Sequence, residues 1–525
     1  MPDIKDILNS VSNTASISAR AESEKAHYDL SDDFTLPDYM PAIEKVLRVS
    51  ADIGKNGKYV HANSAEMLGE VIYKVLYLGD NKMPRTVSLS ASFEHTKELP
   101  SDDECTIMFF PYIDEISFKV TGPRKITLKS KVGFTTDVIC EVSAEPKITG
   151  GTCHIERLWR NIDHHKMLCF SDDENHVSED IEIPAEFPAV GEILNCNITP
   201  YLTECRAAGD QINTSYGVNV SVLYTAEAFE DAEESSLPKY VRFDKKIPLQ
   251  VALSAPGVTP EYECYAEMRT GEIEAKADIN NLGEMRVIEL DFDMPVKVSC
   301  FKNVCDRIVC DAFSTDCDIQ LNRRRIECKK LIKNTVSNFS DRILIPSDDG
   351  KINELLDLGI ITVPGEITVK KNKLQMDGNC YFSAIINDEN SEIRALNGEK
   401  AIRFECECPT PLGESEHLCN TEVSDVRCRI DGATLCIDFE ITVSMMVFDK
   451  AYEEFVSAIN VEKKSEDCPK HTGLRMYYPN SDETLWNIAK KYRVGIDTLI
   501  HENSLAEASD PRSNIPTEKH VLIIP

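Results

Sequence analysis

The residues with the greatest potential for chemistry lie in one short stretch, CHIERLWRNIDHHKMLC, residues 153–169. Its cysteines and histidines are the ligand types of a tetrahedral zinc site; they are Cys153, His154, His164, His165 and Cys169. The stretch lacks the C-x-x-C or H-x₃₋₅-H spacing by which zinc knuckles close around the ion. We therefore expect a strand and loop with reduced thiols and no bound metal.

The remaining cysteines also favour a structural use. The chain has 19 cysteines, an odd number without the spacing of a small disulfide-rich domain. Cys300, Cys305 and Cys310 recur every fifth residue, and Cys406 and Cys408 share one face of an expected strand. Neither spacing closes a chelate without long loops. Buried, reduced cysteine behaves as a small apolar residue, so we expect the reducing environment of the cytosol.

Motifs that anchor common enzyme classes do not occur in the sequence. The 525 residues contain no G-x-S-x-G, G-x-x-x-x-G-K-[ST] or H-E-x-x-H motif. Pairs of carboxylates carry no weight against a background of 89 acidic residues. We expect no catalytic residue, no cofactor and no enzymatic activity. A cell-wall hydrolase with an unrecognised catalytic domain is the enzymatic alternative.

The formal net charge of -32 argues against two classes of partner. Binding to phosphate backbones and to anionic lipid surfaces depends largely on Lys and Arg, which acidic residues outnumber here. No run approaches the roughly eighteen apolar residues that cross a bilayer. Residues 1–30 show no basic segment followed by the apolar run of a secretory signal. We therefore expect no nucleic-acid binding, no membrane insertion and a cytoplasmic location.

Three parts of the chain repeat the same landmarks, which indicates an internal repeat. Each part has a strand pattern ending in proline, a leucine ten residues later, an aliphatic run ending thirty residues beyond the leucine, and then a phenylalanine followed by an acid. The prolines and leucines are Pro37 and Leu47, Pro184 and Leu194, and Pro346 and Leu356. The later landmarks are Tyr77 and Phe93, Tyr224 and Phe243, and Ile386 and Phe404.

Each copy is expected to end in a long hairpin. In the third copy, every second residue of 435–447 is apolar after the turn pair Asp431-Gly432, which hairpins favour. Strands at regular intervals with brief helical signals predict a mainly β fold of three antiparallel β-sandwich or barrel-like units. The expected boundaries are an N-terminal extension over 1–33, units over 34–145, 181–300 and 343–452, adaptors over 146–180 and 301–342, and a linker over 453–472.

Three motifs inside this repeat carry a family resemblance: LPDYMPAIEKVLRV at residues 36–49, VLY at 75–77 and GPRKITLKSKV at 122–132. With the triple copy, they resemble the SipL-type spore-coat family of endospore-forming Firmicutes, which is built from SPOCS domains. The resemblance implies a non-enzymatic coat morphogenesis factor. It also implies synthesis in the mother cell cytosol and deposition at the forespore surface with a coat-assembly ATPase.

The C-terminal stretch DETLWNIAKKYRVGIDTLIHENSL, residues 482–505, resembles a LysM module, a family of small domains that usually bind N-acetylglucosamine polymers. The resemblance implies a β-α-α-β domain over 473–525. It also implies a shallow glycan groove between the loop into the first helix and the loop into the last strand. Leu485, Ile488, Ala489 and Tyr492 have the spacing of a buried helical face, so we expect them in the core.

The residues matched to that groove form the candidate ligand site: Asp482, Glu483, Thr484, Trp486, Asn503, Ile515 and Pro516. Asp482 and Glu483 replace the family's usual Gly-Asp, which adds a side chain and a negative charge where glycine permits close backbone approach. Trp486 lies off the apolar helix face. It is either an anchor for a partner or a residue packed against a neighbouring repeat.

The sequence thus favours a scaffold protein of spore-coat assembly that docks to a coat morphogenetic protein at the forespore surface through its LysM-like domain. The expected partners are a spore-coat morphogenetic ATPase or other coat proteins. The alternative is a peptidoglycan-binding protein of the wall or spore cortex, with N-acetylglucosamine-containing glycan as its ligand. Glycan binding and protein docking both stay open, because fold does not fix function.

Overall fold

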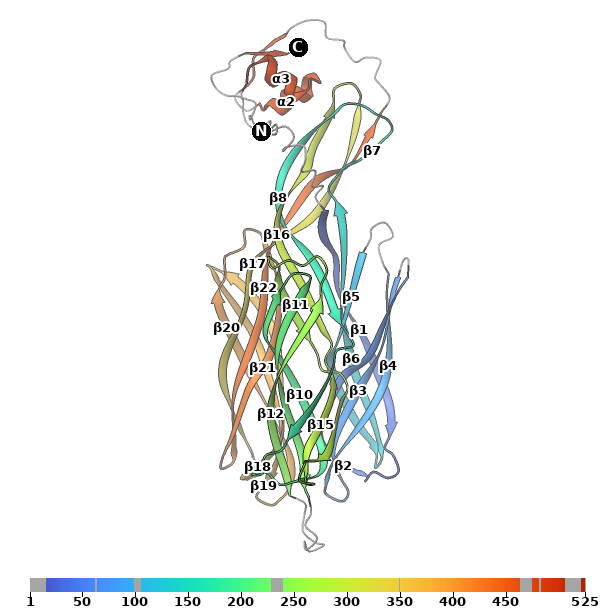
Figure 1. Cartoon of the computed structure of the whole chain (residues 1–525), viewed down its shortest axis with the longest axis vertical. Helices are drawn as coiled ribbons and strands as arrows, with labels where there is room; N and C mark the ends of the chain where they lie inside the picture. Colours follow the sequence, from blue (N-terminus) through green and yellow to red (C-terminus); the bar gives the residue numbers. More distant parts are fainter. Residues whose placement is uncertain are drawn as a thin grey trace.

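The computed structural model describes residues 16–61, 64–98, 105–227, 239–348, 350–462, 475–480, 483–505 and 521–524. These residues form long strands and, near the C-terminus, two short helices. The strands run along the long axis of an elongated body, which continues into a narrower stalk that carries the helices (Figure 1). The predicted mainly β fold class is confirmed. None of the described helices is long and apolar enough to cross a lipid bilayer.

Three units in the body each contain an antiparallel sheet of three consecutive strands. In unit 1 these are β2 (Ile43–Val60), β3 (Ser64–Gly79) and β4 (Pro84–Glu98). In unit 2 they are β10 (Val190–Ala207), β11 (Gln211–Ala226) and β12 (Tyr240–Ser254). In unit 3 they are β18 (Ile352–Lys370), β19 (Lys373–Asp388) and β20 (Ile393–Glu407). The same up-and-down order therefore occurs three times.

A second sheet faces the first in each unit and has the order β1-β6-β5, β9-β15-β14 or β17-β22-β21. In unit 1 its strands are β1 (Ser16–Thr35), β5 (Cys105–Gly122) and β6 (Lys125–Ser143). In unit 2 they are β9 (His176–Glu182), β14 (Ile273–Ile279) and β15 (Met285–Asp293), and in unit 3 β17 (Ile319–Pro346), β21 (Glu414–Asp431) and β22 (Thr434–Val461). The expected hairpins close these sheets, and Gly432 takes the positive φ of 61° that its turn requires.

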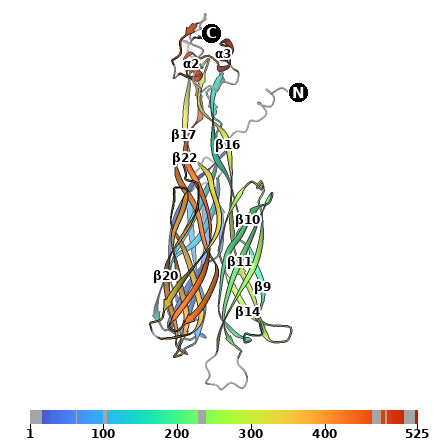
Figure 2. The same cartoon turned by 90° about the vertical axis from the view of Figure 1, so that its left-hand side faces the viewer.

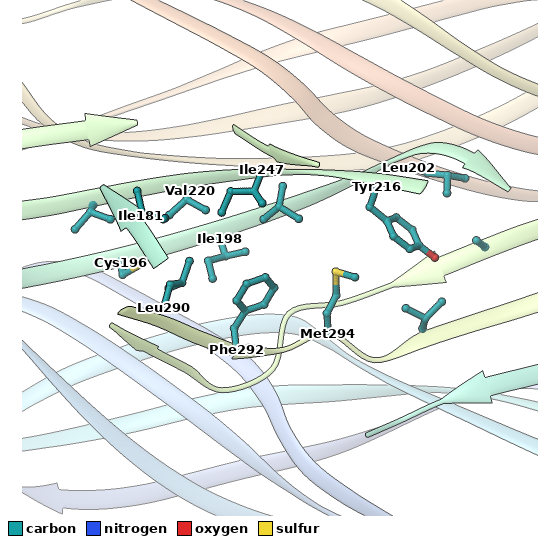
Figure 3. Close-up of a cluster of buried hydrophobic side chains, with 14 of the residues drawn as sticks. Ile181, Cys196, Ile198, Leu202, Tyr216, Val220, Ile247, Leu290, Phe292 and Met294 are labelled. Atoms are coloured by element: carbon teal, nitrogen blue, oxygen red, sulfur yellow. The ribbon is translucent and has the colours of Figure 1, made fainter. Parts of the chain in front are cut away.

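The apolar residues that alternate along these strands meet between the two sheets of each unit. In unit 2, Leu290 and Phe292 of β15 and Met294 just after it face Tyr216 and Val220 of β11, as Figure 3 shows. In unit 3, the alternating residues of 435–447 are likewise buried. The period of two therefore places one face of each strand in a core of its own unit.

The expected boundaries and the observed elements differ at the N-terminus and in the adaptors. Residues 16–33, the expected N-terminal extension, form most of β1, and β1 pairs along β6. The pairing covers an edge of β6 that would otherwise present unpaired backbone groups. The adaptor regions hold long strands, namely β8 (Ile155–Asp172), part of β16 (Val296–Ser314) and the first part of β17. The sequence suggested short strands there because charged residues interrupt the apolar alternation.

These long strands build the stalk. β8 pairs with β16, β17 pairs with β22, and β7 (Lys147–Thr149) adds a parallel strand to the end of β22. Val309, Ala312, Val456 and Ile459 form a small buried cluster between the two strand pairs. Near the body, β13 (Glu263–Met268) joins β16. The stalk is thus a continuation of the second sheets of units 2 and 3, which Figure 2 shows from the side.

The three units close into a ring. The last strand of each first sheet contacts the first strand of the next: β4 contacts β10, β12 contacts β18, and β20 contacts β2. The first strands β2, β10 and β18 therefore occupy equivalent places around a common axis. The repeat in the sequence corresponds to an approximate threefold arrangement of the body.

Candidate functional site

The C-terminal module has the element order β23 (Arg475–Tyr477), α2 (Leu485–Tyr492), α3 (Ile496–Glu502) and β24 (Leu522–Ile524). β23 and β24 pair antiparallel. Leu485, Ile488 and Ala489 are buried in one cluster with Leu499 and Leu522, as their helical spacing predicts. The same cluster also contains Phe313 of the stalk, so the core of the module is continuous with the stalk, and its predicted ligand residues can be placed relative to that core.

Two of the predicted ligand residues organise the start of α2. Thr484 is the N-cap residue, and its hydroxyl accepts a hydrogen bond of 3.2 Å from the backbone N–H of Asn487. The Glu483 carboxylate accepts hydrogen bonds of 2.8 Å from the Tyr477 hydroxyl and of 2.9 Å from the backbone N–H of Asn480. These hydrogen bonds lower the pKa of Glu483. Both side chains hold the loop before the helix in place.

Asn503 ties the second helix to the closing strand. Its side-chain amide donates hydrogen bonds to the carbonyls of Leu499 and Ile523, at 2.9 and 2.8 Å, and its carbonyl oxygen accepts one of 2.6 Å from the N–H of Ile523. The residue is buried. The observed contacts of Asn503 are therefore within the chain, and they fix the position of β24.

Trp486 joins the module to the stalk. Its ring packs edge-on against Phe313 of β16, with ring centroids 5.0 Å apart, and its indole N–H donates a hydrogen bond of 2.8 Å to Asp311. Lys490 also binds the Asp311 carboxylate, at 2.7 Å, and Arg493 forms an ion pair with Asp318. Only 4% of Trp486 is exposed. In this arrangement its ring contacts the stalk and is not available to a ligand.

The other predicted groove residues, Asp482, Ile515 and Pro516, lie outside the described residues. The four that are described, Glu483, Thr484, Trp486 and Asn503, come from one end of α2 and one end of α3. Each of them makes hydrogen bonds inside the chain. No closed ligand groove can therefore be traced from the described members of this set.

The outer face of the β23–β24 pair carries exposed apolar side chains that the sequence did not single out. Met476 is 71% exposed and pairs with Ile523, which is 38% exposed. Tyr478, two residues beyond Met476, is 68% exposed. The sequence indicates this surface by alternation. Tyr477 points towards Glu483, to which it donates a hydrogen bond, so its neighbours Met476 and Tyr478 lie on the opposite face. We call Met476, Tyr478 and Ile523 the module patch.

The axis of the body is lined by the repeated leucines. Leu47, Leu194 and Leu356 each occupy a β-bulge, because the register shifts at this point of β2, β10 and β18. A bulge adds an unpaired residue and redirects its side chain. The three leucines therefore leave their own cores and meet in one buried cluster. The other members are Leu76, Leu78, Leu223, Tyr240, Ile385 and Ile393.

A polar cluster lies beside the leucines. The next residues along the three strands are Arg48, Asn195 and Asp357, and the Arg48 guanidinium donates to the Asp357 carboxylate. Asn195 and Asn197 each donate a hydrogen bond of 2.8 Å to Asp357, which is 2% exposed. One equivalent position is thus positive, neutral and negative in the three units, and direct contacts to Asp357 link all three units at this point.

Of the candidate zinc ligands in residues 153–169, Cys153 and His154 precede β8, and His164, His165 and Cys169 lie along it. His164 and His165 are buried, and His165 lies between Phe301 and Phe448, with ring centroids 5.2 Å from each. Its Nδ1 donates a hydrogen bond of 2.7 Å to the carbonyl of Lys329. Burial lowers the pKa of His165 to about 4. The ring is therefore neutral near pH 7 and serves packing between the β8-β16 and β17-β22 pairs.

The other cysteines are dispersed, although Cys264 and Cys300 face each other across β13 and β16 with their sulfur atoms 3.2 Å apart. None of the cysteines in the described part of the chain forms a disulfide. Cys305 is exposed, whereas Cys408 is buried. Along β16, Cys300 is buried, Cys305 is exposed and Cys310 is half-buried, so the spacing of every fifth residue brings these three side chains to different surroundings and not to one site.

Three sandwich units around a shared axis define a multi-unit β-sandwich protein. Residues 189–278 match the family model described as SipL, SPOCS domain. This segment is therefore similar to a SPOCS domain, and the match runs from the start of β10 nearly to the end of β14. It links the chain to sporulation and the spore coat. No curated protein and no solved structure matches the chain.

Proposed function

We propose that the chain is a non-enzymatic scaffold of spore-coat assembly whose C-terminal module docks onto a coat morphogenetic protein at the forespore surface. The observation that carries the proposal is the module patch. Its apolar side chains are exposed at the far end of the stalk, away from the three units (Figure 1). Apolar and aromatic residues of this kind supply much of the binding energy of protein interfaces.

The charge of the module supports a protein partner. Residues 474–525 contain nearly equal numbers of acidic and basic residues, so almost all of the chain's net charge of -32 belongs to the rest. The patch can therefore approach an acidic or a basic protein surface without strong repulsion from its own module. The acidic remainder of the chain has the opposite property, because it repels other acidic surfaces.

Glycan binding by the same module is the alternative. The family resemblance of residues 482–505 favours it, whereas the intramolecular contacts of Glu483 and Trp486 favour docking. These two residues would line the implied groove, and they instead bind Tyr477 and the stalk. The two functions are separable, since a glycan needs the groove and a protein partner needs the module patch.

A binding assay with the full chain tests the proposal. We expect the wild-type chain to bind the purified coat morphogenetic ATPase, and Met476→Glu or Tyr478→Glu to weaken binding at least about 10-fold, as loss of an interface hot spot does. Tyr39→Glu is the matched control, because Tyr39 is an aromatic residue of the body with 85% exposure. It should bind as the wild type does.

N-acetylglucosamine oligomers serve as the competing ligand in the same assay. Binding of the ATPase that is unaffected by either patch variant would refute the docking surface. Micromolar binding of the oligomers, without binding of the ATPase, would instead establish the glycan alternative.

A further inference from the structure

A cluster of two thiols and a carboxylate lies at the tip of the stalk. The ligand atoms of Cys153, Asp316 and Cys317 all lie within 4.8 Å of one another. Among the residues that the structure describes, this is the one group of three or more His, Cys, Asp or Glu side chains that converge in this way. Cys153 precedes β8, whereas Asp316 and Cys317 lie in the turn between β16 and β17. The approach of Cys153 to Asp316 and Cys317 cannot be read from the sequence, because the two segments are far apart along the chain.

Hydrogen bonds hold the two segments together around this cluster. The backbone N–H of His154 donates a hydrogen bond of 3.2 Å to Oδ1 of Asp316, which links the start of β8 to the turn. Within the turn, the Ser314 hydroxyl donates to the same oxygen at 2.8 Å and accepts from the N–H of Cys317 at 3.2 Å. The donor atoms are therefore positioned by the backbone of both segments. Cys317 is buried, and Cys153 and Asp316 are half-buried.

We propose that Cys153, Asp316 and Cys317 bind one Zn²⁺ ion. Thiolate and carboxylate are both zinc ligands, with metal–ligand distances of about 2.3 Å for sulfur and about 2.0–2.2 Å for oxygen. Such ligands lie roughly 3.5–4 Å apart on a tetrahedral ion, so small side-chain rotations bring the three atoms into place. A water molecule takes the fourth position. Each thiol loses its proton to solvent on binding, and the ion forms bonds to the two resulting thiolates and to one carboxylate oxygen.

The site lies next to the part of the stalk that contacts the C-terminal module. Asp318, two residues after Asp316, forms the ion pair with Arg493. The carboxylate of Glu156, three residues after Cys153, lies beside Gly495 at the start of α3. A bound ion would therefore fasten the turn and the start of β8 to each other at the place where both contact the module. The proposed role of the zinc is to stiffen the platform that carries the docking module.

Metal titration of the full chain tests this site. The protein is purified with a phosphine reductant, treated with a chelator and titrated with Co²⁺ and then with Zn²⁺. We expect one Co²⁺ per chain, with the near-ultraviolet charge-transfer absorption of a cobalt–thiolate bond, and its displacement by one equivalent of Zn²⁺. Cys153→Ser and Cys317→Ser should each abolish this absorption and weaken Zn²⁺ binding by at least about 100-fold, because even outer-shell changes cost 10–100-fold.

Two controls make the result decisive. Cys305→Ser removes an exposed thiol elsewhere on β16 and should leave the stoichiometry and affinity unchanged. Asp316→Asn keeps the shape of the turn, and it should weaken Zn²⁺ binding while the thermal midpoint of the metal-free chain stays at the wild-type value. Absence of stoichiometric binding to the wild type would overturn the proposal. So would unchanged binding to the Cys153→Ser and Cys317→Ser variants, or a Cys153–Cys317 disulfide in protein kept under reductant.

Discussion

The junction at the axis of the body and the junction between stalk and module are built from different contacts. At the axis, nine buried apolar residues from all three units pack together beside the cluster of Arg48, Asn195 and Asp357. At the stalk tip, Trp486 supplies one ring contact and one hydrogen bond, and Lys490 and Arg493 add ion pairs at the surface.

We therefore expect the axis to determine the stability of the body, and the junction at the stalk tip to determine how the module is held. Burial of large apolar side chains contributes about 1.5–3 kcal/mol for each of them, whereas exposed ion pairs contribute about 0–1 kcal/mol. The axis therefore holds the three units together as one body through nine apolar side chains, whereas the module is held through the buried pair Trp486 and Phe313 and through ion pairs at the surface. Changes at the axis should affect the whole fold, and changes at the stalk tip should affect the module alone.

The largest effect is expected from Asp357→Ala. The change leaves the guanidinium of Arg48 buried without its carboxylate and removes the acceptor of Asn195 and Asn197, so we expect the free energy of unfolding to fall by about 3–5 kcal/mol. Asp244→Ala is the control, because its ion pair with Arg242 lies at the surface. Urea titration of both variants measures the effect. An equally small loss of unfolding free energy in both variants would show that the contacts of Asp357 at the axis contribute no more to stability than a surface ion pair.

Substitution of the leucines at the three β-bulges should lower the free energy of unfolding nearly as much. Leu356 is 1% exposed in the axis cluster, so Leu356→Ala should lower the free energy of unfolding by about 2–5 kcal/mol through lost burial and the cavity left behind. Leu344→Ala changes an exposed leucine of β17 and should cost no more than about 0.5 kcal/mol. The same urea titration compares them. A Leu356→Ala protein as stable as Leu344→Ala would contradict the shared axis.

The base of the stalk, between the two junctions, should respond to pH through His165. Burial lowers its pKa from 6.5 to about 4, so the unfolded chain binds the proton first as the pH falls. The stability it contributes is present above pH 6.5 and is lost as the pH falls towards 4, by on the order of 3 kcal/mol. We expect His165→Gln to flatten the dependence of unfolding free energy on pH in this window. An equally steep dependence in the variant would assign the titration to other groups.

The smallest global effect is expected at the stalk tip. Trp486→Ala removes the contact with Phe313 and the hydrogen bond to Asp311, so amide hydrogens of α2 should exchange at least about 10-fold faster. The urea midpoint of the body should stay unchanged. Trp486→Phe keeps an aromatic ring and loses only the N–H hydrogen bond, and it should be intermediate. A lower midpoint for the body in Trp486→Ala would show that the two junctions are coupled.

The strand pattern of the body could be read from the sequence, because a period of two and a turn pair such as Asp431-Gly432 are local signals. The shared axis was also marked, since Val46-Leu47, Ile193-Leu194 and Leu355-Leu356 each break the alternation with two adjacent apolar residues. A bulge produces this break. The contacts between Arg48, Asn195 and Asp357 could not be predicted from the sequence. These residues differ between the three copies, whereas internal repeats are recognised by residues that are the same in each copy.

The candidate site was less predictable for a different reason. Trp486 was found from a local resemblance, but Phe313 and Asp311, which hold it, lie on a strand that is distant in sequence. The same is true of Cys153 and Cys317, whose approach depends on how β8 meets the turn after β16. Local spacing reports which residues share an element, whereas these contacts depend on the path of the whole chain.

Deletion of residues 473–525 tests most directly the claim that the body is self-sufficient and that the module docks it at the forespore. The shortened chain and the full chain are compared in sporulating cells by fluorescence localisation, and in solution by urea titration. We expect an unchanged unfolding midpoint for the body together with loss of localisation at the forespore surface. Normal localisation of the shortened chain, with the body intact, would contradict it.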